Sequence, residues 1–292
     1  MPQTLTTSAP HPRPPLISVV VPTRDSPEQV DRLLTSLAAQ DCAGVEVLVN
    51  DDRRSRRPLD EVVDRHRRQG LDVRLIRDNP TRAAGRRRGT AHTSAPLVLH
   101  LDSDMTAEPG LLRECRQLIE HQGYDALVIP EVSVGEGFWA RCKVLEKRCH
   151  DGDARVESLR CLRRDLYQRI GGHDEELVWA EDRDLDLRAR AARARVGLCT
   201  QVLLHHEGTI TLRDTMRKKA HYARTADRFA AKHPQDFAAQ ASPRRLLTLG
   251  RRGWRESRNP VLVAGLVFLK ACEYAAAGST LLALRISRTV TR

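Results

Sequence analysis

The feature that most constrains the fold of this chain is a regular alternation of short apolar runs with amphipathic or polar stretches between residues 16 and 129. The apolar runs have the length and β-branched content of buried strands, and they cover residues 16–21, 45–49, 71–76, 97–101 and 126–129. The stretches between them predict helices at residues 26–37, 58–69, 81–92 and 108–121. This alternation predicts an α/β fold in which helices cover both faces of a mostly parallel sheet.

Composition indicates how large a folded core the chain can form and which class of partner it favours. The chain has 292 residues, 40% of them hydrophobic, which suffices for one large domain and an appendage. We expect a disordered leader at residues 1–15, an α/β domain at 16–235 and a helical segment at 236–292. The net charge of +11, mostly from Arg, favours phosphate-bearing partners. The seven cysteines include no Cys-x-x-Cys pair, which predicts free thiols in a reducing cytosol.

Acidic side chains follow two of the predicted strands. The strand at 97–101 ends in Asp102-Ser103-Asp104, and Asp51-Asp52 follows the strand at 45–49. Because side chains alternate along an extended segment, Asp102 and Asp104 are expected to point the same way. Two carboxylates on one side suit a hard divalent cation such as Mg²⁺ or Mn²⁺, which also takes phosphate oxygens. The alternative is a loop with two solvated aspartates.

The second half of the chain is less regular. It predicts a helix at 138–149, a highly charged helix at 182–194, a strand at 196–204 and a basic helix at 211–232. The strand is expected to end just before His205-His206-Glu207.

Several short motifs, read together and in this order, resemble those of the family 2 glycosyltransferases of the GT-A fold. They are Val21-Pro22-Thr23-Arg24, Asn50-Asp51, Gly85-Arg86-Arg87-Arg88-Gly89, Leu101-Asp102-Ser103-Asp104, Gly171-Gly172-His173-Asp174-Glu175, Glu181-Asp182 and His205-His206-Glu207. The resemblance covers roughly residues 16–235 and is specific as a set, although each motif alone is weak. Arg87 departs from it, standing where the family has Asn, and Asn50 stands where the family has a first Asp.

The resemblance implies an inverting transfer of a sugar from a nucleotide diphosphate, usually of uridine, to a hydroxyl acceptor. It implies that Asp104 ligates Mn²⁺ or Mg²⁺ and that Asp102 holds the ribose or a metal-bound water. One of His205 and His206 would complete the coordination, and we prefer His205. In isolation, a half-buried helix or strand terminus is the better explanation of this pair. The nucleotide site would consist of Pro22, Thr23, Arg24, Asp51, Arg86 and Asp102.

The same resemblance assigns the catalytic pair. Inversion by a single in-line attack needs one general base for the acceptor hydroxyl, and Asp182 is the candidate. Glu181 would orient the acceptor. The alternative for Asp182 is an N-cap of the helix at 183–194, and the two roles can coexist. The Gln-x-x-Arg-Trp motif of processive synthases is absent, so we expect transfer of single sugars.

Residues 261–284 form an almost uninterrupted apolar stretch, long enough to span a bilayer. Lys270 and Glu273 lie near its middle, where each would cost about 2.5–3.5 kcal/mol in a bilayer. Basic residues flank the stretch: Arg251, Arg252, Arg255 and Arg258 precede it with Trp254, and Arg285, Arg288 and Arg292 follow it. We expect residues 251–292 to contact an anionic membrane surface, mostly as a helix lying on it. The alternative is a helix packed on the catalytic domain or on a partner subunit.

Membrane contact would place the protein in the cytoplasm at the inner face of the cell membrane, where a lipid-linked acceptor would suit it. Three other functions fit parts of the sequence. A nucleotidyltransferase would need a Gly- and Lys/Arg-rich loop after the first strand, which this chain lacks. A basic nucleic-acid-binding protein leaves the acidic strand ends unexplained, so we expect no nucleic acid partner. A non-catalytic sugar-nucleotide binder remains an alternative.

Overall fold

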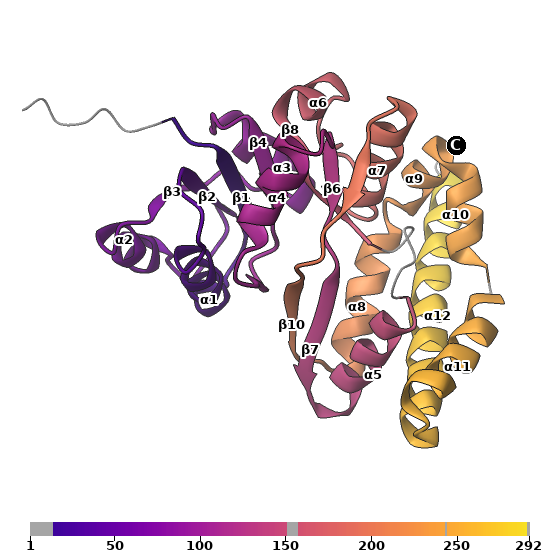
Figure 1. Ribbon diagram of the computed structural model, residues 1–292. Coiled ribbons are helices and arrows are strands. Elements are labelled where there is room, and N and C mark those ends of the chain that lie inside the picture. Colours follow the sequence, from indigo (N-terminus) through magenta and orange to yellow (C-terminus); the bar gives the residue numbers. More distant parts are fainter. Residues whose placement is uncertain (1–13, 151–156, 243, 291–292) are drawn as a thin grey trace, which may run out of the picture.

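The computed structural model describes residues 14–150, 157–242 and 244–290 (Figure 1). The leader expected at residues 1–15 therefore lies, apart from Pro14 and Pro15, outside the described residues. The strands are β1 (Ile17–Thr23), β2 (Val45–Asp51), β3 (Asp72–Ile76), β4 (Leu97–His100), β5 (Met105–Ala107), β6 (Ala126–Val128), β7 (Glu131–Glu136), β8 (Leu159–Arg163), β9 (Val196–Leu198) and β10 (Leu203–Thr209).

The helices that surround these strands are α1 (Pro27–Ala38), α2 (Asp60–Arg68), α3 (Arg82–Ala91), α4 (Leu111–Glu120), α5 (Gly137–Arg148), α6 (Arg164–Arg169) and α7 (Glu181–Ala191). The chain then continues through α8 (Leu212–Ala223), α9 (Ala226–Lys232), α10 (Pro234–Ala241), α11 (Arg244–Ser257) and α12 (Pro260–Val290).

The main sheet has seven strands in the order β3-β2-β1-β4-β8-β6-β9. Strands β1, β2, β3 and β4 are parallel to their neighbours within this group, as are β6 and β9 to each other. Strand β8 runs antiparallel to both β4 and β6. The expected α/β fold with a mostly parallel sheet is therefore confirmed. The order reverses between β1 and β4, and ligands bind at such switch points, outside the carboxyl ends of the strands.

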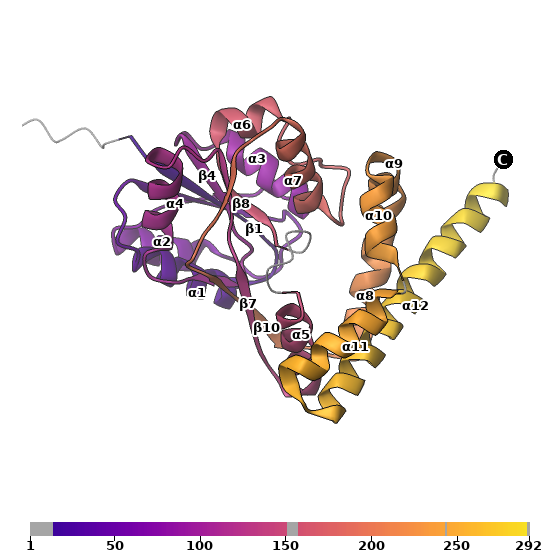
Figure 2. The same cartoon turned by 45° about the vertical axis from the view of Figure 1, so that its right-hand side comes forward.

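Helices cover both faces of this sheet (Figures 1 and 2). Alternate residues of β1, such as Val19 and Val21, pack in one core with Leu33 of α1 and Leu111 of α4. On the opposite face, Gly89 of α3 lies so close to Val20 that an added Cβ would come within 2.7 Å of it. Strand β1 is thus buried on both sides, as its continuous apolar sequence predicts.

Two expected elements are wrong in their extent. The single strand expected at 196–204 is two strands, because Glu114 accepts hydrogen bonds from the backbone N–H groups of Thr200 and Gln201 and removes them from the ladder. Strand β10 then contains His205-His206-Glu207 instead of ending before them. The basic helix expected at 211–232 is likewise two helices, α8 and α9.

A second sheet, β5-β10-β7, extends away from the main sheet (Figure 1). Strand β10 pairs antiparallel with β5 and parallel with β7. Because β5 follows Asp104 directly, this pairing sets His205 opposite Met105 and lets the His206 N–H donate to the Asp104 carbonyl oxygen at 2.8 Å. The second sheet therefore brings the late histidines to the acidic tip of β4.

The C-terminal helices form a layer beside α5 and α8 (Figure 2). Leu266 and Leu269 of α12 are buried together with Cys142 and Leu145 of α5. Lys270 and Glu273 face the protein, where they pair with Glu146 and Lys143 of α5. By length and composition, Pro260–Leu284 is the one helix of the described chain that could cross a membrane, and 17% of its apolar window is buried. The side chains of Arg285 and Arg288, and Arg292 entirely, lie outside the described residues.

Candidate active site

Arg86 of α3 joins the strand ends to the start of α7. Its side chain is fully buried, Nη2 donates to Asp102 Oδ1 at 2.6 Å, and Nη1 donates to Glu181 Oε1 at 3.3 Å and to Asp182 Oδ1. One guanidinium thus bonds three carboxylates that lie far apart in the sequence. A buried charge needs such partners, because burying it alone is very unfavourable.

Asp102 is held by two arginines. Its Oδ2 faces Arg160 Nη2 at 3.3 Å, and its Oδ1 faces Arg86. Burial raises the pKa of Asp102, but the two guanidinium groups outweigh this effect and hold that pKa well below its ordinary value. Asp102 is therefore ionised, with both oxygens engaged by cations of the protein itself.

Asp182 lies in the first turn of α7, where Ala180, with φ of 60°, occupies the N-cap position. The N-cap alternative for Asp182 is thus not what the helix adopts. Both contacts of its carboxylate go to Oδ1: one from Arg86, and one from His173 Nε2 at 3.3 Å. Its side chain is 20% exposed, against 5% for Glu181. Among the residues that the structure describes, Oδ2 therefore has no side-chain hydrogen-bond partner.

The pKa values of the acidic pair are shifted in opposite directions. Burial opposes ionisation of Asp182, but Arg86, with help from His173 and Arg160, holds its pKa well below the ordinary value. For Glu181, burial prevails over Arg82 and raises the pKa. His173 is fully buried, and burial lowers its pKa to about 4, so the ring is neutral at pH 7. Asp182 therefore presents an ionised carboxylate, the form that a general base requires.

Asp104 and His205 form a second, more exposed pair. Asp104 Oδ2 lies 3.3 Å from His205 Nε2, and Glu131 and Glu207 stand about 4 Å from His205 Nδ1, at 3.9 Å and 4.0 Å. Burial alone would lower the pKa of His205, but Asp104, Glu207 and Glu131 raise it. His206 points elsewhere and bonds Thr106 Oγ1 at 3.0 Å.

The protein supplies only part of the ligand set that a metal ion needs. Within residues 14–150, 157–242 and 244–290, no three His, Cys, Asp or Glu side chains converge tightly enough to hold one. The donor set of Asp104 and His205, an oxygen and an imidazole nitrogen surrounded by surplus carboxylates, nevertheless fits a divalent cation that takes its other ligands from a diphosphate.

The expected nucleotide residues lie around the carboxyl ends of β1 and β2. Thr23 is buried, and its Oγ1 has no hydrogen-bond partner among the described groups. Asp51 is buried, accepts from Ser55 Oγ at 2.5 Å, and has its pKa raised by burial. Pro22 is paired with Asn50 in the sheet, and Arg24 is half exposed and lies 3.7 Å from Asp52.

The hydrogen bonds of Asn50 account for an amide at this position, where the family has Asp. Its amide nitrogen donates to the carbonyl oxygens of Asp78 at 3.0 Å and Gly85 at 2.9 Å, while its Oδ1 accepts from the Asp78 N–H at 2.8 Å. A carboxylate could not donate either bond. Arg87, the other departure, is half exposed and lies 3.9 Å from Glu175.

Sequence reasoning missed Arg82, Glu131, Arg160 and Tyr222. Arg160 Nη2 bonds Glu131 Oε1 at 2.6 Å besides facing Asp102, and Arg82 Nε lies 2.9 Å from Glu181 Oε1. Tyr222 OH accepts from Arg82 Nη2 at 3.0 Å. One signal was present, because an arginine inside the short apolar run Leu159-Arg160-Cys161-Leu162 demands a buried anionic partner.

The strand order, the switch point between β1 and β4 and the acidic tip of β4 define a GT-A fold. The sequence profile described as Glycosyl transferase family 2 matches residues 18–172, which is more than half of the chain. The chain therefore belongs to glycosyl transferase family 2.

Curated relatives agree with this assignment. Two curated proteins named pre-mycofactocin glycosyltransferase, from two strains of Mycobacterium tuberculosis, are each 30% identical to the chain over 255 residues. The alignment covers 78% of this chain and 52% of each relative, so the chain spans about half their length.

Two solved structures share the fold. S. aureus TarS 1-349, in complex with UDP-GlcNAc, has a TM-score of 0.55 and 18% identity, with 93% of this chain and 92% of that one covered. The mannosyltransferase PcManGT from Pyrobaculum calidifontis, in complex with GDP-Man and Mn2+, has a TM-score of 0.57 and 18% identity, with 99% and 84% covered.

Proposed function

We propose that this protein is a metal-dependent, inverting glycosyltransferase that moves one sugar from a nucleotide-diphosphate donor to a hydroxyl acceptor. The observation that supports it best is the placement of Asp182. Its carboxylate is ionised and partly exposed, and Arg86 ties it to Asp102 at the carboxyl end of β4. A sugar bound at this sheet edge would thus have a base beside it.

Asp182 Oδ2 takes the proton of the acceptor hydroxyl as that oxygen attacks the anomeric carbon from the side opposite the diphosphate. Arg86 and His173, both bonded to Oδ1, fix the direction of the carboxylate. Glu181, held by Arg82, orients the acceptor. A single displacement of this kind inverts the anomeric centre.

Asp104 and His205 would hold Mn²⁺ or Mg²⁺ together with the donor phosphates. A bound cation there would neutralise the charge that develops on the leaving diphosphate. Asp102, engaged by Arg86 and Arg160, would serve the ribose rather than the metal. Asp51 would accept a hydrogen bond from the base, and Thr23 would lie beneath it, with Pro22 and Arg24 also in the nucleotide site.

Single-sugar transfer follows from the absence of the processive motif. Uridine is the proposed base, because TarS binds UDP-GlcNAc, although PcManGT binds GDP-Man. We place the protein in the cytoplasm, with α12 lying on the inner face of the membrane. Lys270 and Glu273 form ion pairs with side chains of α5, and this pairing argues against insertion of α12 across the bilayer.

The test is a screen of donor hydrolysis in Mn²⁺ with UDP-, GDP- and TDP-sugars. A metal-dependent enzyme hydrolyses one donor class slowly and stops when EDTA is added. A non-catalytic sugar-nucleotide binder would bind a donor without turnover. If no donor binds or is hydrolysed, the proposal is wrong.

A further inference from the structure

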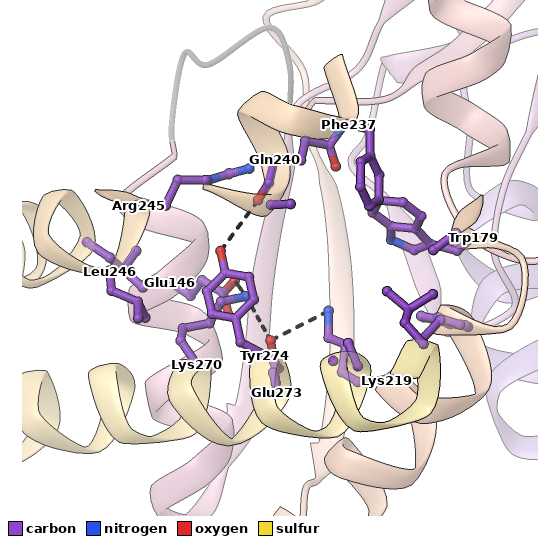
Figure 3. A pocket seen from close by; sticks show the side chains of 18 of the residues that line it. Glu146, Trp179, Lys219, Phe237, Gln240, Arg245, Leu246, Lys270, Glu273 and Tyr274 are labelled. Atoms are coloured by element: carbon purple, nitrogen blue, oxygen red, sulfur yellow. Dashed lines mark hydrogen bonds and ion pairs between the residues drawn. The ribbon is translucent and has the colours of Figure 1, made fainter. Parts of the chain in front are cut away.

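A cavity of about 640 Å³ lies between the C-terminal helices and the start of α7 (Figure 3). Its walls are largely aromatic and aliphatic, with Trp179, Phe237, Leu246, Tyr274 and Leu281 among them. This volume is typical of sites that enclose one small molecule. None of the proposed donor-binding residues lines it.

Helix α12 leaves this space open because its residues there are small. Ala277 and Gly278 line the cavity one turn after Glu273 and Tyr274, on the same face of the helix. A Cβ added to Gly278 would meet nothing within 4 Å. Larger side chains at these positions would fill the cavity instead of packing against protein.

The floor of the cavity carries a surplus positive charge. Lys270 bonds both Glu146 at 2.6 Å and Glu273 at 2.7 Å, and Lys143 bonds Glu146 at 2.8 Å. Lys219 joins this group through a longer contact of 3.5 Å to Glu273 (Figure 3). Three lysines of this cluster thus face two glutamates, and two of them, Lys219 and Lys270, line the cavity. Burial together with Lys270 lowers the pKa of Lys219 to about 8. An anionic group would relieve that charge.

One residue of the cavity wall is linked to the proposed catalytic pair through Arg82. Trp179 stands two residues before Glu181, and Tyr222, another lining residue, accepts from the same Arg82 that pairs with Glu181. A ligand in the cavity would therefore lie near Glu181, the residue that we propose orients the acceptor.

We propose that this cavity binds the non-reacting body of the acceptor, a small amphipathic molecule with an aromatic or aliphatic body and one anionic group that pairs with Lys219. The inference rests on the proposed transferase function and specifies the class of its acceptor. Charge complementarity and size select this occupant: the lysine surplus calls for one anion, and the walls call for an apolar body.

The experiment titrates the full chain with 1-anilinonaphthalene-8-sulfonate, an aromatic anion, and with the neutral N-phenyl-1-naphthylamine, following dye fluorescence. The wild-type chain should bind one molecule of either dye. Ala277→Phe and, independently, Gly278→Val should weaken both dyes at least about tenfold. The matched control is Ala275→Phe, an exposed position of α12 outside the cavity, which should bind both dyes as wild type does.

Lys219→Met supplies the charge test. It should weaken the anionic dye about tenfold and change the neutral dye by less than about twofold. Equal dye affinities in wild type and in both cavity-filling variants would overturn the inference. A competition titration in which only phosphatidylglycerol vesicles displace the dye would also overturn it, because that result would indicate a lipid site.

Hydrolysis of UDP-sugars by the same wild-type samples separates the two proposals. If wild type hydrolyses a UDP-sugar but the cavity-filling variants bind the dyes as wild type does, the acceptor site is rejected. The transferase function is then still supported. Cavity-dependent dye binding without donor binding or turnover rejects the transferase function.

Discussion

Arg86 organises the site at the scale of single residues. Its guanidinium bonds Asp102, Glu181 and Asp182 at once, and its side chain is fully buried. Removing it would leave Asp182 without its guanidinium partner, while Asp102 and Glu181 would keep only Arg160 and Arg82 in a low-dielectric environment. The geometry of Asp182 therefore depends on a residue of α3 that is 96 positions away in sequence.

Replacement of Asp182 by Asn removes the proposed base and keeps the shape of the side chain. We expect the turnover number to fall by about 10²- to 10⁴-fold while UDP affinity stays within a few-fold. Steady-state donor hydrolysis and calorimetric titration with UDP measure the two effects. Asp165→Asn, at a well-exposed position of α6, is the matched control and should match wild type. Unchanged turnover in Asp182→Asn would rule out this base.

His173 should make stability depend on pH. Its pKa is about 4 in the folded protein and about 6.5 when unfolded, so the unfolded state binds more protons between these values. The contribution of His173 to the free energy of unfolding is therefore fully present above pH 6.5 and is lost as pH falls toward 4. From pH 7.5 to pH 5, His173 should account for about 2 kcal/mol of lost unfolding free energy.

Urea denaturation at both pH values checks this. His173→Phe, which replaces the imidazole with an apolar ring that cannot titrate, should show a pH dependence smaller by that amount. The same pH dependence in the variant and in wild type would contradict a buried neutral imidazole at this position.

Some of the site could be predicted at this scale, and some could not. Asp102, Asp104 and the pair Glu181-Asp182 belong to local motifs, so their positions at strand and helix ends follow from nearby sequence. Arg160 and Glu131 do not, because their pairing depends on β8 and β7 lying near β4, a long-range arrangement that no local pattern encodes. The choice between His205 and His206 likewise needed the register of β10 against β5.

At the scale of elements, ion pairs fasten α12 to α5 and α8. Glu273→Gln would leave Lys143, Lys219 and Lys270 facing Glu146 alone, with a neutral amide in place of the buried carboxylate. Breaking a buried pair in this way typically costs about 3–5 kcal/mol, and we expect about 3 kcal/mol of lost unfolding free energy. Urea denaturation of Glu273→Gln against Glu256→Gln, at an exposed position of α11, measures it. A loss no larger than that of the control would show that the pairs contribute nothing.

The sequence predicted the elements best where strands and helices alternate. Runs such as 45–49 are buried on both faces, so apolar continuity alone identified β2 and its neighbours. Strands β5, β7 and β8 were missed because they are short or carry charged residues, including Arg160 and Glu131, whose partners lie across the sheets. The break at Thr200 was missed for a similar reason, since the carboxylate of Glu114 on another helix causes it.

At the scale of the whole molecule, one side of α12 remains uncovered. Val261, Phe268 and Leu282 are exposed by 66%, 54% and 60% along this helix. An apolar helix face beside basic residues is typical of attachment to an anionic membrane. We expect the full chain to sediment with phosphatidylglycerol vesicles at low salt and less well at high salt.

The double variant Phe268→Glu with Leu282→Glu should lose that sedimentation. Leu198→Glu, at an exposed position on β9, adds a charge elsewhere and should sediment as wild type does. A wild-type chain that stays in solution at low salt, or a double variant that sediments fully, would contradict membrane attachment through α12.

The measurement that tests the account most directly is the affinity for UDP with and without Mn²⁺. If Asp104 and His205 share a cation with the diphosphate, wild type binds UDP at least about tenfold more tightly in Mn²⁺ than in EDTA. Asp104→Asn and His205→Ala should lose this difference, whereas His206→Ala, whose ring bonds Thr106, should keep it. Equal wild-type affinities for UDP in Mn²⁺ and in EDTA would contradict the account.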